Sequence, residues 1–368
     1  MSALADLLPR IAEREARDPE SYPSENIADL MAGGVISAPF PAGLGGNGAS
    51  LVEAVEAVEA VAAVSGSTAL IMSMPLGLAG VYGLGVDIAP KAYRATWAAQ
   101  IETVAANYRA GEIYAACNSE KGAGGSLAAT QTVANLDGSG TFRITGEKIL
   151  ASSGKYAGHF FSSAKVSPDQ MPGCGIVEFF FVRPDGEGVE VLNDWDGFGM
   201  RSTESQTVRY SEAPVEGMMG FPNFIELVQP LQYWYCLFAA IPLGCALGMI
   251  RVLGDPAPSS PAIRLRLAEA LMRYEALRAY LRETASQFRA GAGPAFAARA
   301  LRTKTYVTQE STRLCAELFA LSGGRHYRRT GAVARMLADS FAGTALRPPL
   351  PLALDTLVEN FALPERAE

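Results

Sequence analysis

The chain carries a short polar run that leads into a glycine-rich turn, Asn118-Ser119-Glu120-Lys121-Gly122-Ala123-Gly124-Gly125-Ser126. Glycine lets the backbone amides of such a turn approach a ligand phosphate closely, because no side chain stands in the way. Hydroxyl-rich turns beside strands more often only cap backbone groups, so the run alone leaves both interpretations open. Its place in the chain adds information, because it comes just after the sequence changes, near Tyr114, from a helical pattern to a strand-like one.

On the N-terminal side of Tyr114 the sequence is typical of helices. Ser50 is a good helix cap, and Pro9 is expected to bend the first helix or to mark its true start. The expected helices cover residues 4–16, 50–64, 68–84 and 90–109. Residues 1–113 are therefore predicted to form an N-terminal helical domain.

Residues 114–217 are predicted to form a β-domain. Short β-branched and aromatic runs alternate there with Gly, Asp and Ser turns. The expected strands cover residues 131–136, 141–145, 175–183 and 207–210. Such spacing indicates an antiparallel sheet or a small barrel.

Residues 218–368 are predicted to form a C-terminal helical bundle. The expected helices cover residues 222–254, 261–288, 293–321 and 330–341. Helices at both ends of a β-rich middle indicate an α+β chain and not a doubly wound one.

The composition excludes several classes of function. The 368 residues carry a formal net charge of -7 and no basic run, so a nucleic-acid partner is not expected. The five cysteines form no CxxC pair and the chain has two histidines, which indicates free thiols in a reducing compartment and no metal centre. The apolar stretch over residues 237–252 is shorter than a typical membrane span and is interpreted as a core helix. No membrane association is expected, and the predicted location is the cytoplasm.

Further motifs occur in a fixed order along the chain. They are Leu44–Gly48, Gly146–Lys148 followed by Ala151–Gly154, Gly199–Thr203 with Ser205, Pro242–Gly244, and Leu321–Gly324. Together with residues 118–126, these segments resemble those of the acyl-CoA dehydrogenase family in order and spacing. The resemblance covers nearly the whole chain, and it implies the family's arrangement of helical, β and helical domains.

The resemblance implies an FAD cofactor. Ser119 would bond the pyrimidine edge of the flavin, Ser152 would lie near its N5 atom, and the glycine-rich turn would approach the pyrophosphate. The last Gly-Gly pair would face the adenosine half of a cofactor held by a neighbouring subunit. The residues that would contact cofactor are thus Asn118, Ser119, Gly124, Gly125, Ser126, Ala151, Ser152, Gly323 and Gly324.

The chain departs from the family where the catalytic base should stand. The family's usual glutamate aligns with Arg347, which stays protonated and cannot accept a proton. A minority of the family carries the base on the first long C-terminal helix, where this chain has Trp234 or Tyr235. The nearest carboxylate upstream, Glu226, lies more than two helical turns away. The catalytic residue is therefore unknown, and Trp234 and Tyr235 are expected to line the substrate site.

A second departure concerns the family's R-x-x-F-G motif, which reaches a neighbouring subunit's cofactor. Here that region is shortened to residues 254–261, and Arg251 and Arg264 flank it. Either arginine would substitute for the motif or would simply be a solvated residue on a helix surface. His326 and the pair Asp355 and Glu359 are interpreted as surface residues, with a site role as the alternative.

Three functions follow from these features. The first is FAD-dependent CH–CH oxidation of an acyl thioester, carried on coenzyme A or a carrier protein, with an unrecognised or partner-supplied base. The resemblance implies a homodimer or homotetramer, or a complex with a glutamate-bearing relative. The second is a flavin-dependent monooxygenase of the same fold, which needs no glutamate because reduced flavin and O2 do the chemistry. The third is a non-catalytic subunit of an acyl-CoA dehydrogenase complex.

Overall fold

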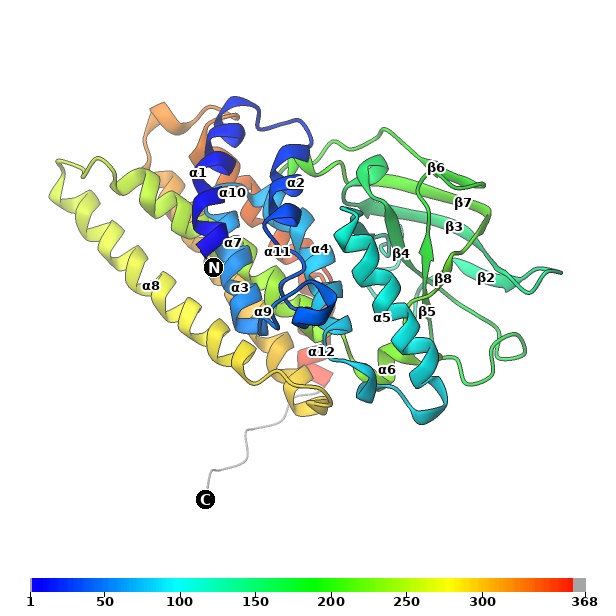
Figure 1. Cartoon of the computed structure of the whole chain (residues 1–368). Helices are drawn as coiled ribbons and strands as arrows, with labels where there is room; N and C mark the ends of the chain where they lie inside the picture. The colour runs from blue at the N-terminus through cyan, green and yellow to red at the C-terminus, as the bar shows by residue number, and fades with distance from the viewer. Residues whose placement is uncertain (1, 360–368) are drawn as a thin grey trace, which may run out of the picture.

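The computed structural model describes residues 2–359 and arranges them as a helical body beside a β-domain (Figure 1). The helices that precede the β-domain are α1 (Ser2–Arg17), α2 (Ser24–Ala32), α3 (Leu51–Ala62), α4 (Gly66–Tyr82) and α5 (Arg94–Arg109). The helices that follow it are α6 (Phe224–Val228), α7 (Leu231–Gly254), α8 (Pro261–Ser286), α9 (Gly293–Leu321), α10 (Ala332–Ser340), α11 (Ala342–Ala345) and α12 (Leu350–Glu359). Short 3-10 turns are η1 (Ala42–Leu44), η2 (Val86–Ile88), η3 (Lys91–Tyr93), η4 (Gly154–Tyr156), η5 (Arg201–Thr203) and η6 (Gly324–His326).

The strands form two four-stranded sheets, with the orders β1-β4-β5-β8 and β2-β3-β7-β6. They are β1 (Tyr114–Ala116), β2 (Val133–Leu136), β3 (Phe142–Ala151), β4 (His159–Ala164), β5 (Glu178–Val182), β6 (Val189–Val191), β7 (Gln206–Pro214) and β8 (Gly217–Met218). Only β1 and β4 pair in parallel among these strands. A shared core that includes Phe160, Phe180, Ile144 and Val208 fills the space between the sheets. The predicted α+β fold with a mainly antiparallel middle domain is confirmed.

Most predicted helices agree with the structure to within a few residues. Ser50 caps α3 as expected, with its hydroxyl accepting from the Glu53 backbone and the Glu53 carboxylate accepting in return. The first helix continues through Pro9, so Pro9 does not mark its start. No helix was predicted over α2, and the single helix expected over residues 222–254 is wrong because Gln229 and Pro230 separate α6 from α7.

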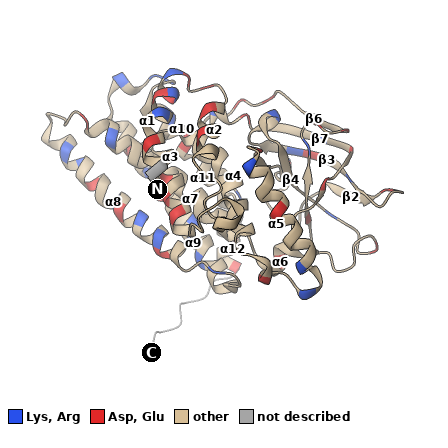
Figure 2. Ribbon diagram, viewed as in Figure 1, with Lys and Arg blue, Asp and Glu red and all other residues tan. Residues whose placement is uncertain are grey.

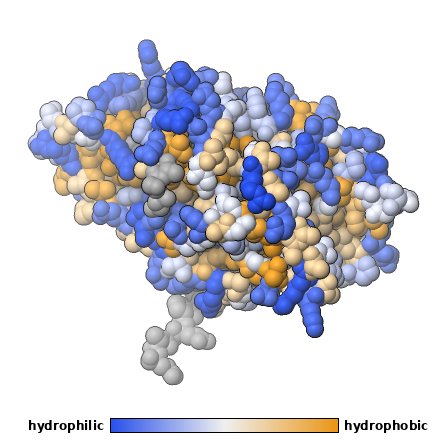
Figure 3. Space-filling model, in the orientation of Figure 1, coloured by the Kyte–Doolittle hydropathy of each residue, from blue (hydrophilic) through white to orange (hydrophobic). Residues whose placement is uncertain are grey.

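Helix α7 is the centre of the helical body. It packs against α3, α4, α8, α9 and α10, and charged residues lie mainly on outer helices such as α8 (Figure 2). By length and composition α7 is the one described helix able to cross a membrane, but 78% of its most apolar window is buried inside the fold. Hydrophilic residues cover most of the face seen in Figure 3, with apolar surface confined to separate patches.

Two glycines let α7 lie directly on α3. A Cβ atom on Gly244 would meet the Glu59 carbonyl oxygen at 2.3 Å, and one on Gly248 would meet the Ala63 carbonyl oxygen at 2.3 Å. Backbone atoms cannot rotate away as a side chain can. The Pro242–Gly244 motif therefore fixes the separation of these two helices.

A buried carboxylate joins the helical body to the β-domain. The Asp339 Oδ1 atom, on α10, accepts a hydrogen bond of 2.6 Å from the Met200 backbone N–H. Burial raises the pKa of Asp339 to about 6, although that bond and the charges of Arg335 and Arg201 act in the opposite direction. Gly199, beside Met200, packs so closely that a Cβ there would meet the Ala338 carbonyl oxygen at 2.3 Å.

We expect Gly244→Ala to lower the free energy of unfolding by about 1–3 kcal/mol, because the added methyl overpacks the α3–α7 contact. Gly254→Ala is the matched control in the same helix, since a Cβ there meets no atom within 4 Å. The control is expected to be neutral or slightly stabilising. Urea unfolding of both variants checks this, and equal effects would contradict the packing argument.

The pKa of Asp339 predicts how stability changes with pH. The folded state binds this proton more tightly than the unfolded state, so the contribution of Asp339 to stability falls as pH rises from about 4 to about 6. Asp339→Asn should therefore gain stability relative to the wild type over this window, by up to about 3 kcal/mol. Urea midpoints at pH 4.5 and pH 7.5 measure the gain. The exposed Asp355→Asn controls for the substitution, and a pH-independent difference for Asp339→Asn would refute the assignment.

Candidate functional site

A largely apolar cavity of about 300 Å³ lies where the β-domain meets α4, α7 and the segment that follows α10. Its apolar walls include Phe161, Phe179, Trp195, Phe198, Trp234, Phe238 and Phe341. Its polar contributors are Asn118, Ser119, Ser152, Ser205, Tyr235 and Arg347. Residues from all three predicted domains therefore converge on one site, with mostly apolar walls and a few polar groups, as in ligand pockets generally.

A chain of hydroxyls runs along one wall. The Ser152 and Ser205 hydroxyl oxygens lie 2.9 Å apart, and those of Ser205 and Thr203 lie 2.6 Å apart. The Thr203 hydroxyl donates to the Met200 carbonyl oxygen at 2.8 Å. Each hydroxyl has one proton to donate, so Ser205 donates to Thr203 and Ser152 donates to Ser205. Ser152 is therefore left as a hydrogen-bond acceptor at the cavity.

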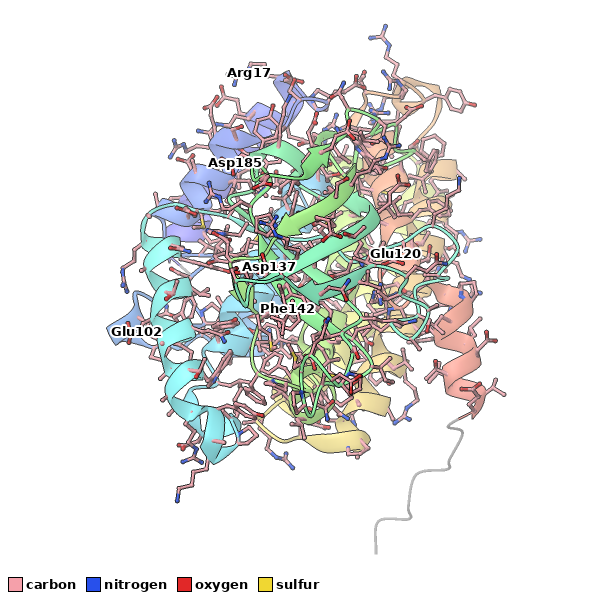
Figure 4. All side chains as sticks on the ribbon, turned by 90° about the vertical axis from the view of Figure 1, so that its right-hand side faces the viewer. Arg17, Glu102, Glu120, Asp137, Phe142 and Asp185 are labelled. Atoms are coloured by element: carbon pink, nitrogen blue, oxygen red, sulfur yellow. The ribbon has the colours of Figure 1, made fainter. Side chains whose placement is uncertain are left out.

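A buried ion pair supports the segment that carries Ser119. The Lys148 Nζ atom, fully enclosed, donates to Glu120 Oε1 and to the Ser163 carbonyl oxygen, both at 2.6 Å. Glu120 also accepts from the Gln131 N–H at 2.6 Å and from the Thr132 hydroxyl at 2.7 Å. Burial opposes the ionisation of Glu120, but these bonds outweigh it and hold the pKa of Glu120 below its ordinary value. Figure 4 shows Glu120 on the side of the strands that faces the C-terminal helices.

Asn118 and Ser119 are also fixed by strand pairing. The Asn118 Oδ1 atom accepts from the Ser163 N–H at 2.8 Å, and the Ser119 carbonyl oxygen accepts from the Ile149 N–H at 2.8 Å. The Asn118 amide oxygen is thus engaged in the fold. The Ser119 side chain lines the cavity, where the resemblance places the edge of a ligand ring.

Arg347 reaches the cavity from the segment between α11 and α12. Its Nη2 atom donates to the Asn118 carbonyl oxygen at 3.2 Å, whereas its Nη1 atom is enclosed without a hydrogen-bond partner among the described residues. Burial lowers the pKa of the guanidinium, while Tyr235 and Glu120 oppose that shift.

Lys304, on α9, holds this segment on both sides of Arg347. Its Nζ atom donates to the carbonyl oxygens of Leu346 at 2.8 Å and Pro348 at 2.7 Å. Burial lowers the pKa of Lys304 to about 7. Nothing in the sequence singled out this lysine, because its anchoring partners are backbone carbonyls that carry no sequence signature.

The aromatic run on α7 divides between core and cavity. Trp234 and Tyr235 line the cavity, and their expected contact with substrate stays a prediction. The Trp234 indole N–H donates to the Met74 carbonyl oxygen at 3.3 Å, and a Cβ on Gly77 would meet its Nε1 atom at 2.2 Å. Tyr233 is buried in the core, where its ring packs edge-on against Phe288 at 5.1 Å.

The other predicted cofactor residues lie outside the cavity lining. Ala151 is buried in the β3–β7 ladder opposite Gln206. Gly125 packs under the start of α12, since a Cβ there would meet Pro349 Cδ at 2.3 Å. The remaining positions are exposed or half-buried in the glycine-rich turn or at the start of η6, namely Gly124, Ser126, Gly323 and Gly324. Their proposed contacts with a phosphate or with a neighbour's cofactor stay predictions.

The alternative candidates do not reach this cavity. Glu226 accepts from the Ile176 N–H at 3.3 Å, and Arg264 donates to the carbonyl oxygens of Pro258 and Ser259. The His326 Nε2 atom accepts from Arg325, and Asp355 is exposed on α12. Ser205 belonged to a quoted motif but had no assigned role, because its bonds to Ser152 and Thr203 depend on the strand geometry.

Comparison with known proteins gives matches along nearly the whole chain. The models of the acyl-CoA dehydrogenase N-terminal, middle and C-terminal domains match residues 3–101, 115–213 and 241–345. A probable acyl-CoA dehydrogenase of Bacillus subtilis, YngJ, is 24% identical over 335 residues, which are 87% of this chain and 84% of the relative. The L-evernosamine nitrososynthase of a Micromonospora species is 32% identical over 217 residues, which are 58% of this chain and 48% of the relative.

A solved structure of KijD3, in complex with FMN and dTDP-3-amino-2,3,6-trideoxy-4-keto-3-methyl-D-glucose, has the same fold. It superposes with a TM-score of 0.83 at 22% identity and covers 97% of this chain and 91% of KijD3. The domain models, their order and the three-part fold agree with one another. This chain belongs to the acyl-CoA dehydrogenase family.

Proposed function

We propose that this chain is a flavin-dependent monooxygenase that acts on a small, largely apolar substrate bound in the cavity. The composition of the cavity lining carries the proposal. Within residues 2–359 no Asp or Glu lines the cavity, and the lining includes Arg347, which the sequence resemblance aligns with the family's glutamate. Removal of an α-proton requires a positioned base, which a guanidinium cannot supply.

The residues present fit a flavin ring. The ring system needs an apolar floor and hydrogen-bonding groups at its edges, and the cavity offers aromatic walls with Ser119 and Ser152 at the polar side. The direction of the hydroxyl chain leaves Ser152 free to accept from a ring N–H. Resemblance to the family suggested FAD, and the KijD3 complex holds FMN. Both share this ring, so both are cofactors to test.

When bound, a reduced flavin supplies the electrons that activate O2. The protein's own contribution is to bind substrate beside the ring and to exclude water. The aromatic side chains do the latter, because Phe161, Trp234 and Phe238 are largely buried and face a cavity with few polar groups. The Micromonospora relative supports oxygen chemistry, since its name states that it makes a nitroso compound.

Oxidation of an acyl thioester is the second candidate function. The similarity to YngJ over most of both chains favours it. The reaction would take its base from outside the described residues of this chain, and a glutamate-bearing relative in a hetero-complex is the partner to seek. A homodimer or homotetramer and a cytoplasmic location remain predictions.

The two candidates differ in how the bound flavin responds to substrate. We expect the purified chain, loaded with FMN or FAD, to keep its visible absorbance when mixed anaerobically with butyryl-, octanoyl- or palmitoyl-CoA. With a flavin reductase and ¹⁸O₂, a panel of small aromatic compounds and amines should yield products that carry ¹⁸O, detected by mass spectrometry. Bleaching by an acyl-CoA would replace the proposal with the dehydrogenase function.

Ser152 is predicted to bond the flavin ring directly. Ser152→Ala removes one hydrogen bond, worth about 0.5–1.5 kcal/mol, and should weaken flavin binding roughly two- to tenfold. Quenching of flavin fluorescence gives the dissociation constant. Ser211→Ala, at an exposed position of β7, is the control. An unchanged dissociation constant for Ser152→Ala would remove Ser152 from the flavin site.

A further inference from the structure

We infer that the substrate carries an anionic group, such as a carboxylate, and that Arg347 binds it inside the cavity. This inference rests on the proposed function, because it specifies the substrate class of the same site. It begins from the enclosed Nη1 atom of Arg347, which has no hydrogen-bond partner among residues 2–359. A buried charged donor without a partner destabilises the protein. A ligand that supplies an acceptor removes this cost, and the removal adds to the free energy of binding.

The charges around Arg347 do not cancel. Glu120 is the carboxylate that acts on the charge of Arg347. The Lys148 Nζ atom lies 2.6 Å from Glu120 Oε1 and balances its charge. Both Glu120 oxygens also accept hydrogen bonds, from Gln131 and Thr132. Lys304, close by, donates only to backbone carbonyls. Burial lowers the pKa of Lys304 to about 7, so this lysine is only partly charged near neutral pH. Because Lys148 balances Glu120, the charge of Arg347 is left unbalanced among these residues, which favours an anionic ligand.

Arg347 is also held in place before a ligand arrives. The bonds from Lys304 fix the carbonyls of Leu346 and Pro348 on either side of it, and its own Nη2 atom is bonded to the Asn118 carbonyl oxygen. A fixed guanidinium loses little conformational entropy on binding, and its planar fork suits a two-oxygen anion. The enclosed Nη1 atom is the part of the fork that has no hydrogen-bond partner among the described residues.

The cofactor phosphate is the competing partner for this arginine. The glycine-rich turn expected to approach that phosphate lies outside the cavity lining, whereas Arg347 lines the cavity together with Trp234 and Tyr235. The aromatic side chains there suit the apolar part of a substrate. The substrate class is thus a small apolar or aromatic acid, held by its anion at Arg347 and by its hydrocarbon part along α7.

A matched pair of probes tests this inference on the full chain without flavin. Indole-2-carboxylate and indole-2-carboxamide differ in charge but hardly in shape. By isothermal titration we expect the carboxylate to bind at least tenfold more tightly to the wild type. Arg347→Met should reduce this ratio to about twofold or less, and Arg347→Lys should retain a several-fold preference, because it keeps the charge but loses the fork. The exposed Arg328→Met is the matched control and should behave as the wild type.

Several outcomes overturn the inference. They are equal binding of the two probes, no binding of the carboxylate at millimolar concentration, and a preference that survives in a folded Arg347→Met variant. Titration with FMN and riboflavin forms a separate arm. If Arg347→Met weakens FMN alone and leaves the probes unaffected, the arginine binds the cofactor phosphate and the inference fails. The probe experiment needs no O2 chemistry, so its result stands apart from the ¹⁸O experiment.

Discussion

The site depends on the buried ion pair between Lys148 and Glu120. The Lys148 side chain has no exposed surface, so its charge needs an ion-pair partner and hydrogen-bond acceptors. Glu120 and the Ser163 carbonyl oxygen provide them. Removal of either partner would leave a buried charge uncompensated, which typically costs about 3–5 kcal/mol. This pair links the segment just before β2, the middle of β3 and the end of β4 through hydrogen bonds to Glu120 and Lys148. The adjacent Asn118 and Ser119 thereby gain fixed positions at the cavity.

Local sequence pattern and motif order account for the parts of the molecule that could be predicted from the sequence. The helical and β-rich regions follow from local texture, which spacing and turn residues record directly. The break at Gln229 and Pro230 was missed because the apolar pattern continues across it. Ser119, Ser152, Trp234, Tyr235 and Arg347 were named from motif order, and the structure brings them to one cavity. Lys304 and the role of Ser205 were not predicted, because their contacts arise only from the tertiary fold.

If Arg347 stands at the position of the family's glutamate, as the sequence resemblance predicts, the exchange does more than remove a base. It would also reverse the sign of the charge at this end of the cavity, whose lining within residues 2–359 includes no Asp or Glu. Such a site offers no carboxylate among its described residues that can accept a proton, and its positive charge favours recognition of a negative group. Family membership therefore defines the scaffold, whereas the reaction depends on the few polar side chains that the scaffold presents.

The contact of α7 with α3 through Gly244 and Gly248 limits how mutations can change the shape of the cavity. Helix α7 rests on backbone atoms of α3, so it cannot move closer without a clash or move away without opening a gap. The backbone of α7, which forms one wall of the cavity, is thus held in a fixed position. The cavity would accept substrates of other shapes when side chains of α7 such as Trp234 and Phe238 are exchanged, while the backbone of the helix stays in place. Directed evolution of this pocket should accordingly find its gains at a handful of positions and leave the glycines unchanged.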